Sequence, residues 1–202
     1  MRGRFKPWAK PYLEEHKEVA SFDVASLDIP SNCDLEIGGG KGDFAVSYCL
    51  ANPNRHLISF ERDISIAGLF AKKAVEAKIT NLTILPMDLD KAYEELKKYR
   101  FGHIFMNFSD PWPKKKHEKR RLTFAPRLLN IASLLDKDGE IIMKTDNDQL
   151  YEFTKEQIAL AKLTIKEDQP DYKELAENDF MTEYERNFRN EGKSIHRLVI
   201  TK

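Results

Sequence analysis

The sequence lacks the features of secreted, membrane-spanning and metal-binding proteins. It has two cysteines, Cys33 and Cys49, which are too far apart for a metal-binding knuckle and have no second pair of Cys or His residues to complete one. No stretch reaches the roughly 18 apolar residues of a transmembrane helix, and no apolar segment follows the charged N-terminus as in a secretory signal. We therefore expect a cytoplasmic protein with reduced thiols, no metal and no membrane association.

The chain also carries no net charge, because 33 lysines and arginines balance 33 aspartates and glutamates. Global charge therefore indicates no nucleic-acid partner, and any cationic surface must be local. Two segments are locally basic: residues 1–11, which contain no acid, and residues 114–121, where only Glu118 interrupts the basic side chains. The length suits one domain. We expect it to span residues 1–202, with residues 1–30 forming an arm and a short helix before the sheet.

From Asp34 onward, short apolar runs alternate with longer segments of helical spacing, which predicts βαβ units and a parallel sheet. The predicted strands cover residues 34–37, 56–61, 82–86, 103–108 and 140–145. The predicted helices that follow them cover residues 43–51, 64–77, 90–98, 123–135 and 148–161. The remainder is less regular, with a strand at 163–166, a helix at 183–190 and a terminal strand at 197–201. This order of elements predicts an α/β fold.

A glycine-rich turn follows the first predicted strand, with Glu36 shortly before Gly38, Gly39 and Gly40. Glycines let the backbone turn sharply and approach a ligand closely, and the next helix adds its positive dipole end. A dinucleotide fingerprint would need another glycine at position 43, but Asp43 stands there and would repel a pyrophosphate. S-adenosylmethionine, a sulfonium cofactor without phosphate, therefore fits this turn better than NAD.

Acidic residues also follow the second and third predicted strands. Glu61 can accept hydrogen bonds from both ribose hydroxyls of a nucleoside, and Asp88 can receive an adenine amino group. Each is a weak signal alone, because acids that follow strands often only cap the next helix. Together they fall at successive strand ends, beyond which ligands bind in open α/β sheets.

After the fourth predicted strand, the stretch from Asn107 to Pro113 brings Asp110 to a proline-stiffened turn. Asp110 and Trp112 each precede a proline and are expected in extended conformations. A carboxylate beside the cofactor could accept hydrogen bonds from guanine and offset the positive charge that the ring gains on methylation at N7. Because N7 has a free lone pair, this reaction needs no general base.

A basic run begins directly after this turn. Lys114 is close enough to Asp110 to reach a phosphate or the edge of a nucleobase, and the basic side chains after it could contact phosphates. A solvated loop is the simpler interpretation of such a charged segment. Trp112 could stack on a base or pack in the core. Later motifs are also ambiguous, because Asp146 could cap the next helix and Thr182 with Glu185 forms a capping box.

In this order, the motifs strongly resemble those of the bacterial tRNA (guanine-N7)-methyltransferases. The matching segments are residues 35–42, Asn107 to Arg121, Thr145-Asp146, and residues 182–185 with Phe188 and Gly192. The Asp-Pro-Trp-Pro-Lys motif followed by His-x-Lys-Arg-Arg is highly specific, whereas the glycine turn is generic. Two positions depart from the family pattern: Gly39 stands where many relatives have Cys, Thr or Ser, and Ser109 where proline is usual.

The resemblance implies a Rossmann-like class I methyltransferase fold, with a seven-stranded, mostly parallel sheet, helices on both faces and an antiparallel last strand. It implies a tRNA (guanine-46-N7-)-methyltransferase that moves a methyl group from S-adenosylmethionine to the variable-loop guanine, with Asp110 as the catalytic acid. The implied cofactor site contains Glu36, Gly38, Gly40, Glu61, Asp88 and Asp110. The implied guanosine contacts are Lys114, Asp146, Thr182, Glu183, Tyr184 and Glu185, and the implied tRNA contacts are Lys116, His117, Glu118, Lys119, Arg120 and Arg121.

Two other functions stay open at this point. A catalytically silent RNA-binding protein could retain the fold and would bind tRNA with a steep salt dependence but no cofactor. An NAD-linked dehydrogenase is disfavoured by Asp43 and by the Asp-Pro-Trp-Pro turn. The sequence also leaves open whether the protein is a monomer or a homodimer, and whether its N-terminal arm is ordered without tRNA.

Overall fold

The structure is a computed structural model that describes residues 5–202. Its strands are β1 (Cys33–Ile37), β2 (His56–Phe60), β3 (Leu82–Leu85), β4 (Phe101–Asn107), β5 (Leu135–Thr145), β6 (Thr164–Gln169) and β7 (His196–Thr201). Its α-helices are α1 (Ala9–Glu15), α2 (Asp43–Ala51), α3 (Ile64–Glu76), α4 (Leu89–Leu96), α5 (Ala125–Ser133), α6 (Asp148–Leu160) and α7 (Glu183–Asn190). A 3-10 helix, η1, covers Lys115–Arg120.

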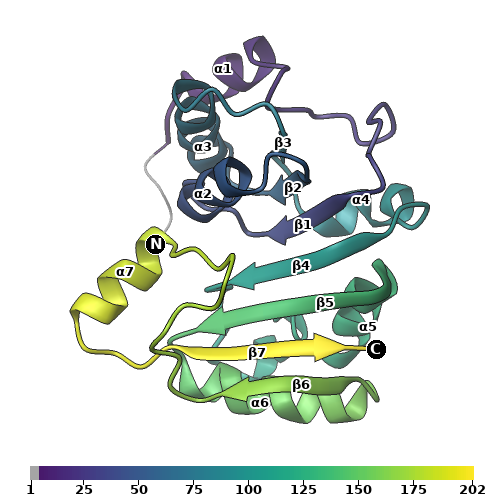
Figure 1. Cartoon of the computed structure of the whole chain (residues 1–202), viewed down its shortest axis with the longest axis vertical. Coiled ribbons are helices and arrows are strands. Elements are labelled where there is room, and N and C mark those ends of the chain that lie inside the picture. The colour runs from purple at the N-terminus through teal and green to yellow at the C-terminus, as the bar shows by residue number, and fades with distance from the viewer. Residues whose placement is uncertain (1–4) are drawn as a thin grey trace.

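The strands form one sheet in the order β3-β2-β1-β4-β5-β7-β6 (Figure 1). The first five strands are parallel, and β7 runs antiparallel to both of its neighbours, β5 and β6. The expected mostly parallel sheet with an antiparallel last strand is therefore confirmed. The strand order reverses between β1 and β4, and ligands of open α/β sheets bind beside such a switch point.

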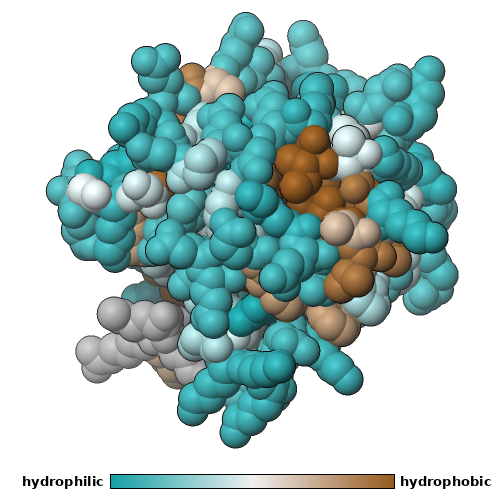
Figure 2. Space-filling view, turned by 90° about the horizontal axis from the view of Figure 1, so that it is seen from below, coloured by the Kyte–Doolittle hydropathy of each residue, from teal (hydrophilic) through white to brown (hydrophobic). Residues whose placement is uncertain are grey.

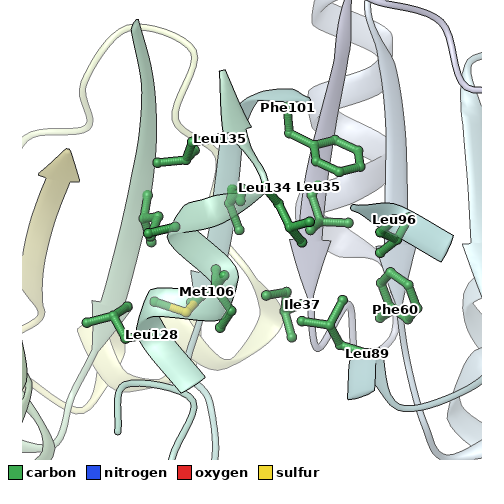
Figure 3. Packing of buried hydrophobic residues seen from close by; sticks show 14 of the residues in the cluster. Leu35, Ile37, Phe60, Leu89, Leu96, Phe101, Met106, Leu128, Leu134 and Leu135 are labelled. Atoms are coloured by element: carbon green, nitrogen blue, oxygen red, sulfur yellow. The ribbon is translucent and has the colours of Figure 1, made fainter. Parts of the chain in front are cut away.

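Both faces of the sheet are covered by helices, because the strands are apolar on both sides. On one face, Leu35, Ile37 and Met106 pack against Leu89 and Leu96 of α4 and Leu128 of α5 (Figure 3). On the other face, Leu57 and Phe105 belong to a cluster with buried residues of α2 and α3. No helix in the described part of the chain combines the length and the apolarity that crossing a bilayer requires. The surface on the side of β6 and α6 is mostly hydrophilic, with one hydrophobic area (Figure 2).

The N-terminal segment is anchored on the domain from residue 5 onward. The expected short helix is α1, and it packs on α3 so closely that a Cβ added at Gly68 would lie 2.4 Å from Cβ of Ala9. The backbone N–H of Lys6 donates to Oγ of Ser65 at 3.0 Å, and Ala20 forms an isolated parallel bridge with Ile84 of β3. The described part of the N-terminal arm is thus held in place by contacts with α3 and β3. The basic residues Arg2 and Arg4 lie outside the described residues.

Most element boundaries differ from those predicted by one to three residues, and two differences are larger. Strand β5 begins at Leu135, five residues earlier than expected, and Leu135 pairs with Phe101 before the register shifts. The charged, glycine-containing sequence from Asp136 to Gly139 looks like a turn, and it forms a bulge in the strand between the pairs Leu135–Phe101 and Glu140–His103. The basic run, expected as a loop, forms η1.

Candidate active site

A cavity of about 860 Å³ lies at the carboxyl ends of the first five strands. Segments that follow each of these strands line it: Gly38–Lys41, Glu61–Asp63, Met87–Leu89, Asn107–Trp112 and Thr145–Asn147, with Thr182–Tyr184 at the start of α7. This volume is within the roughly 300–1,000 Å³ of typical small-molecule sites. The predicted convergence of strand ends on one site is therefore present in the structure.

The glycine turn owes its shape to three residues with positive φ. Gly38, Gly40 and Gly42 have φ values of 88°, 56° and 82°, which glycine adopts without steric cost. Added Cβ atoms at Gly38 and Gly40 would meet no atom of the described chain within 4 Å. At these two positions the requirement is therefore the backbone conformation, and the turn stays open toward a ligand.

Gly39 is constrained by space instead. A Cβ there would lie 2.2 Å from Oγ of Ser59 and 2.8 Å from the ring of Phe70. The Ser59 hydroxyl donates to Oε2 of Glu36 at 2.6 Å, so it cannot move aside without losing that bond. Ser59 and Phe70 therefore leave no room for a larger residue at position 39.

Glu61 is fixed against the glycine turn by two backbone groups. Its Oε2 accepts from the N–H of Gly40 at 3.0 Å, and its Oε1 accepts from the N–H of Asp63 at 2.8 Å. Burial raises the pKa of this carboxyl, and the two backbone hydrogen bonds oppose the rise. Because a carboxylate has about four lone-pair sites, Glu61 keeps acceptor capacity for hydroxyl groups of a ligand.

Two other acids of the cavity are already paired. Asp88 caps α4 by accepting from the N–H of Asp90, and it contacts Arg127 at 3.2 Å. Asp43 lies 2.7 Å from Lys73 and 2.6 Å from Arg186. The charge of Asp43 is therefore balanced, and the prediction that it would repel a pyrophosphate is weakened by these contacts.

Asp110 extends over the cavity from the turn after β4 and forms an ion pair with Arg62. The carboxylate oxygen and the guanidinium nitrogen are 2.7 Å apart, and both side chains are exposed. Arg62 was not predicted, because nothing in the sequence distinguishes it from other exposed arginines. The pair connects the end of β2 to the end of β4 across the switch point.

The turn after Asp110 is held by Arg121. The guanidinium of this nearly buried residue donates from Nε to the carbonyl of Pro111 at 2.8 Å and from Nη2 to that of Trp112 at 3.1 Å. Trp112 has φ 41°, so the expected extended conformation is wrong. Its ring is partly buried, with the guanidinium of Arg120 5.0 Å from its centroid and His117 at its edge.

Thr182 caps helix α7, because its Oγ1 accepts from the N–H of Glu185 at 3.0 Å, which is one half of the predicted capping box. Glu185 itself is fully buried and points away from the cavity toward the ammonium group of Lys144, 2.8 Å away. Lys144 is also fully buried and lies 2.7 Å from Asp179. We call Lys144, Asp179 and Glu185 the Lys144 cluster, and it fixes the start of α7 to β5.

Two further ion pairs join α7 to the glycine turn. Lys41 lies 2.8 Å from Glu183, and Arg186 lies 2.6 Å from Asp43. The partners are 142 and 143 residues apart in the sequence. The predicted cofactor side and the predicted guanosine side of the cavity are therefore in direct contact.

Comparison with known proteins identifies the family. A family model described as a putative methyltransferase matches residues 31–198. The chain is 37% identical over 206 residues to the tRNA (guanine-N(7)-)-methyltransferase of Macrococcus caseolyticus strain JCSC5402, and the match covers 98% of each chain. The chain belongs to the tRNA (guanine-N(7)-)-methyltransferase family.

Solved structures agree with this methyltransferase fold. An antibiotic-related methyltransferase superposes with a TM-score of 0.62 at 16% identity, covering 89% of this chain and 98% of that one. An O-methyltransferase of neocarzinostatin biosynthesis, solved with S-adenosylmethionine, has a TM-score of 0.54 at 10% identity and covers 89% of this chain and 50% of that one. The expected Rossmann-like class I methyltransferase fold is thus confirmed. The alternative of a catalytically silent RNA-binding protein has no support in these comparisons.

In this methyltransferase, the cavity collects most of the residues predicted for the cofactor and guanosine. The predicted residues that line it are Gly38, Gly40, Glu61, Asp88, Asp110, Asp146, Thr182, Glu183 and Tyr184. Glu36, Lys114 and Glu185 lie outside its lining as described for residues 5–202. Of the residues predicted to touch tRNA, Arg120 reaches the cavity, whereas the guanidinium of Arg121 is engaged with backbone carbonyls. Asn107, Arg62 and Arg127 line the cavity without having been predicted.

Glu36 lies beneath the glycine turn of the methyltransferase and is fully buried. Burial raises the pKa of its carboxyl to about 7, although the Ser59 hydroxyl and the nearby Asn107 amide oppose the rise. At neutral pH this group is therefore poised between its neutral and charged forms. Among residues 5–202, no group of His, Cys, Asp and Glu side chains is arranged to hold a metal ion.

The raised pKa of Glu36 predicts a pH-dependent stability. A carboxyl with a pKa of about 7 when folded and 4.5 when unfolded favours folding below pH 4.5 and loses that contribution as the pH rises through 7. Glu36→Gln, neutral at every pH, should therefore raise the free energy of unfolding at pH 8 by up to about 3 kcal/mol, and by much less at pH 5. Urea unfolding of the ligand-free protein at both pH values measures this. Glu14→Gln on the surface of α1 is the control, and equal effects of Glu36→Gln at the two pH values would contradict the prediction.

Proposed function

We propose that the protein methylates N7 of the variable-loop guanine of tRNA, position 46, with S-adenosylmethionine as the methyl donor. One observation carries this proposal: a single cavity joins the glycine turn and Glu61 to Asp110 and the start of α7, and it reaches the basic η1 segment through Arg120. The name of the Macrococcus relative, which matches over nearly its whole length, supports the same activity.

The residues of the cavity fit the proposed cofactor. Open space over Gly38 and Gly40 suits the close approach of a ligand, and Glu61 offers acceptors for ribose hydroxyls. Asp88 offers an acceptor at the third strand end, where an adenine amino group would be received. When bound, S-adenosylmethionine supplies a methyl group that is already activated on a positively charged sulfur.

Asp110 would act on the guanine rather than on the methyl donor. A carboxylate there can accept hydrogen bonds from the guanine N1–H and amino group, which fixes the ring in the cavity. Its negative charge would also offset the positive charge that develops on the ring as N7 is alkylated. No proton has to leave N7, so the protein supplies alignment and charge compensation. Arg62 would hold the Asp110 carboxylate in place through the ion pair described above.

The exposed lysine side chains of η1 would contact phosphate groups of tRNA. Lys115, Lys116 and Lys119 are exposed on η1, beside the turn that carries Asp110. Arg121 is better assigned to holding that turn, because its guanidinium already donates to two carbonyls. The basic segment therefore has two proposed roles: its exposed lysines contact phosphates, and Arg121 holds the turn that carries Asp110.

Replacing Lys115, Lys116 and Lys119 together by serine should weaken tRNA binding and make it less sensitive to salt. Each lost phosphate contact removes a slope of roughly 0.7–0.9 from the plot of log affinity against log salt, so the expected change is about 2 to 3. Filter binding between 50 and 300 mM KCl measures it. The matched control replaces Lys97, Lys98 and Lys137, which lie near the amino ends of β4 and β5, whereas the cavity lies at the carboxyl ends of the strands. An unchanged slope in the η1 variant would show that these side chains do not meet phosphate.

The activity itself is tested by incubating the protein with unmodified tRNA and S-adenosylmethionine labelled in the methyl group. The expected product contains label at guanine 46 and is cleaved there by aniline after reduction, which identifies N7 as the modified atom. A tRNA transcript with adenine at position 46 is the control and should remain unlabelled. Label at another nucleotide, or none with a folded protein, would overturn the proposed function.

A further inference from the structure

The side-chain amide of Asn107 makes no hydrogen bond with any other group of residues 5–202. The residue ends β4, lines the cavity and is 6% exposed. Among residues 5–202, neither its Nδ2 nor its Oδ1 has a hydrogen-bond partner. Buried polar side chains in native proteins are nearly all hydrogen-bonded, so such an amide calls for a ligand.

The polar neighbours of Asn107 are occupied with other partners. On one side, Lys144 is opposite Asn107 in the β4–β5 register, but its ammonium contacts Asp179 and Glu185. On the other side, Glu36 accepts a hydrogen bond from Ser59. The Asn107 amide is close enough to lower the pKa of Glu36, yet the two side chains do not have hydrogen-bond geometry. Among residues 5–202, the amide thus lies near the Glu36 carboxyl without a partner in hydrogen-bond geometry.

The chemistry of an amide limits the ligand group that would satisfy it. An amide presents an acceptor oxygen and donor N–H groups side by side, so its complement must offer a donor and an acceptor together. The ammonium and carboxylate groups of an α-amino acid do this. The N7 edge of guanine does not, because N7 and O6 are both acceptors. Glu36, buried behind the amide, adds a carboxyl whose charged form favours a cationic group.

The position of Asn107 also separates it from the adenosine groups. Glu61 and Asp88 follow β2 and β3, on the far side of β1 from β4. Asp110 and the start of α7 lie on the other side of the cavity, where the guanine would bind. Asn107 is therefore at the boundary between the two, next to the end of β1.

We propose that Asn107 binds the amino-acid portion of the cofactor, with Oδ1 accepting from the ammonium group and Nδ2 donating to the carboxylate. This inference rests on the proposed function, since it takes S-adenosylmethionine as the ligand. It makes Asn107 a binding residue of the cofactor site that the sequence motifs did not reveal. It also gives the buried Glu36 a role, as the negative charge behind the ammonium group.

The test compares two ligands, one with and one without the amino-acid portion of the cofactor. S-adenosylhomocysteine contains the amino acid, whereas 5′-deoxy-5′-methylthioadenosine has the adenosine and sulfur without it. Isothermal titration calorimetry should show that Asn107→Ala and Asn107→Ser weaken S-adenosylhomocysteine binding by about 10- to 100-fold, as expected for hydrogen bonds to charged groups. Both variants should bind 5′-deoxy-5′-methylthioadenosine within about twofold of the wild type. The control Asp88→Asn should weaken both ligands alike.

Thermal unfolding distinguishes ligand binding from a structural role. Because the amide makes no hydrogen bond within the described chain, Asn107→Ser should unfold near the wild-type temperature without ligand but gain less stability from S-adenosylhomocysteine. Equal weakening of both ligands, or of neither, would overturn the role of Asn107 while leaving the proposed function intact. A rise in KM for tRNA with unchanged S-adenosylhomocysteine affinity would assign the amide to guanine instead. Failure of the wild type to bind either ligand would overturn the proposed function as well.

Discussion

Replacement of Asp110 by asparagine should lower kcat for tRNA methylation by at least about 100-fold, the scale of losing one electrostatic contact to a transition state. The substitution keeps the size of the side chain but removes the charge that would compensate the alkylated guanine. Affinity for tRNA should remain close to that of the wild type, because most of the binding energy comes from phosphate contacts elsewhere. Single-turnover methylation and filter binding measure the two effects separately.

Two controls make this experiment specific. Asp138→Asn removes an exposed carboxylate near the start of β5, at the end of the strands opposite the cavity. It should leave both measurements unchanged. Arg62→Met removes the partner of Asp110 but keeps the carboxylate, so it should lower kcat less than Asp110→Asn does. A loss of tRNA binding by Asp110→Asn as large as its loss of turnover would mean that Asp110 has a structural role.

Replacement of Lys144 by methionine should destabilise the protein by about 3–5 kcal/mol, because it leaves the buried carboxylate of Asp179 without a cation and Glu185 with Arg189 as its remaining cation. Asp179 and Glu185 are 7% and 0% exposed at the side chain, and Lys144 is the ammonium group between them. Urea unfolding measures the loss. The matched control is Lys41→Met, which breaks the exposed pair with Glu183 and should cost no more than about 1 kcal/mol.

Lys144→Met should also weaken tRNA binding at the cavity, because the Lys144 cluster holds the start of α7. Thr182, Glu183 and Tyr184 begin three residues after Asp179 and line the cavity. Where Lys144→Met is still folded, KM for tRNA should rise more than kcat falls, and hydrogen exchange should increase across residues 179–190. A loss of stability no greater than that of Lys41→Met would show that the cluster does not anchor α7.

The sequence predicted the parallel part of the sheet well, because its strands and helices alternate in regular apolar patterns. It did not predict that β5 begins at Leu135, since the polar residues after Leu135 resemble a turn. These residues form a bulge between two pairs with β4, Leu135 with Phe101 and Glu140 with His103. Local pattern could not show this, because the partner strand lies more than 30 residues away.

The candidate site was predicted less completely than the fold. Acids at strand ends, such as Glu61 and Asp110, could be expected to converge because parallel strands share one edge. The burial of Glu185 and Arg121 could not be expected, because each is charged and owes its position to distant or backbone partners. Asn107 belongs to the specific motif, but only the structure shows that its buried amide has no hydrogen-bond partner among residues 5–202.

The sheet order has a consequence for how the site is assembled during folding. Strand β7 is inserted between β5 and β6, and in the described chain β6 pairs with β7 alone. Helix α7 lies in the connection between β6 and β7 (Figure 1). During synthesis on a ribosome, the glycine turn and Asp110 can therefore be positioned before β6 and α7, because β6 pairs with β7 and β7 is synthesised last. The side of the cavity formed by α7, which we propose binds guanosine, is therefore completed after the side that we propose binds the cofactor.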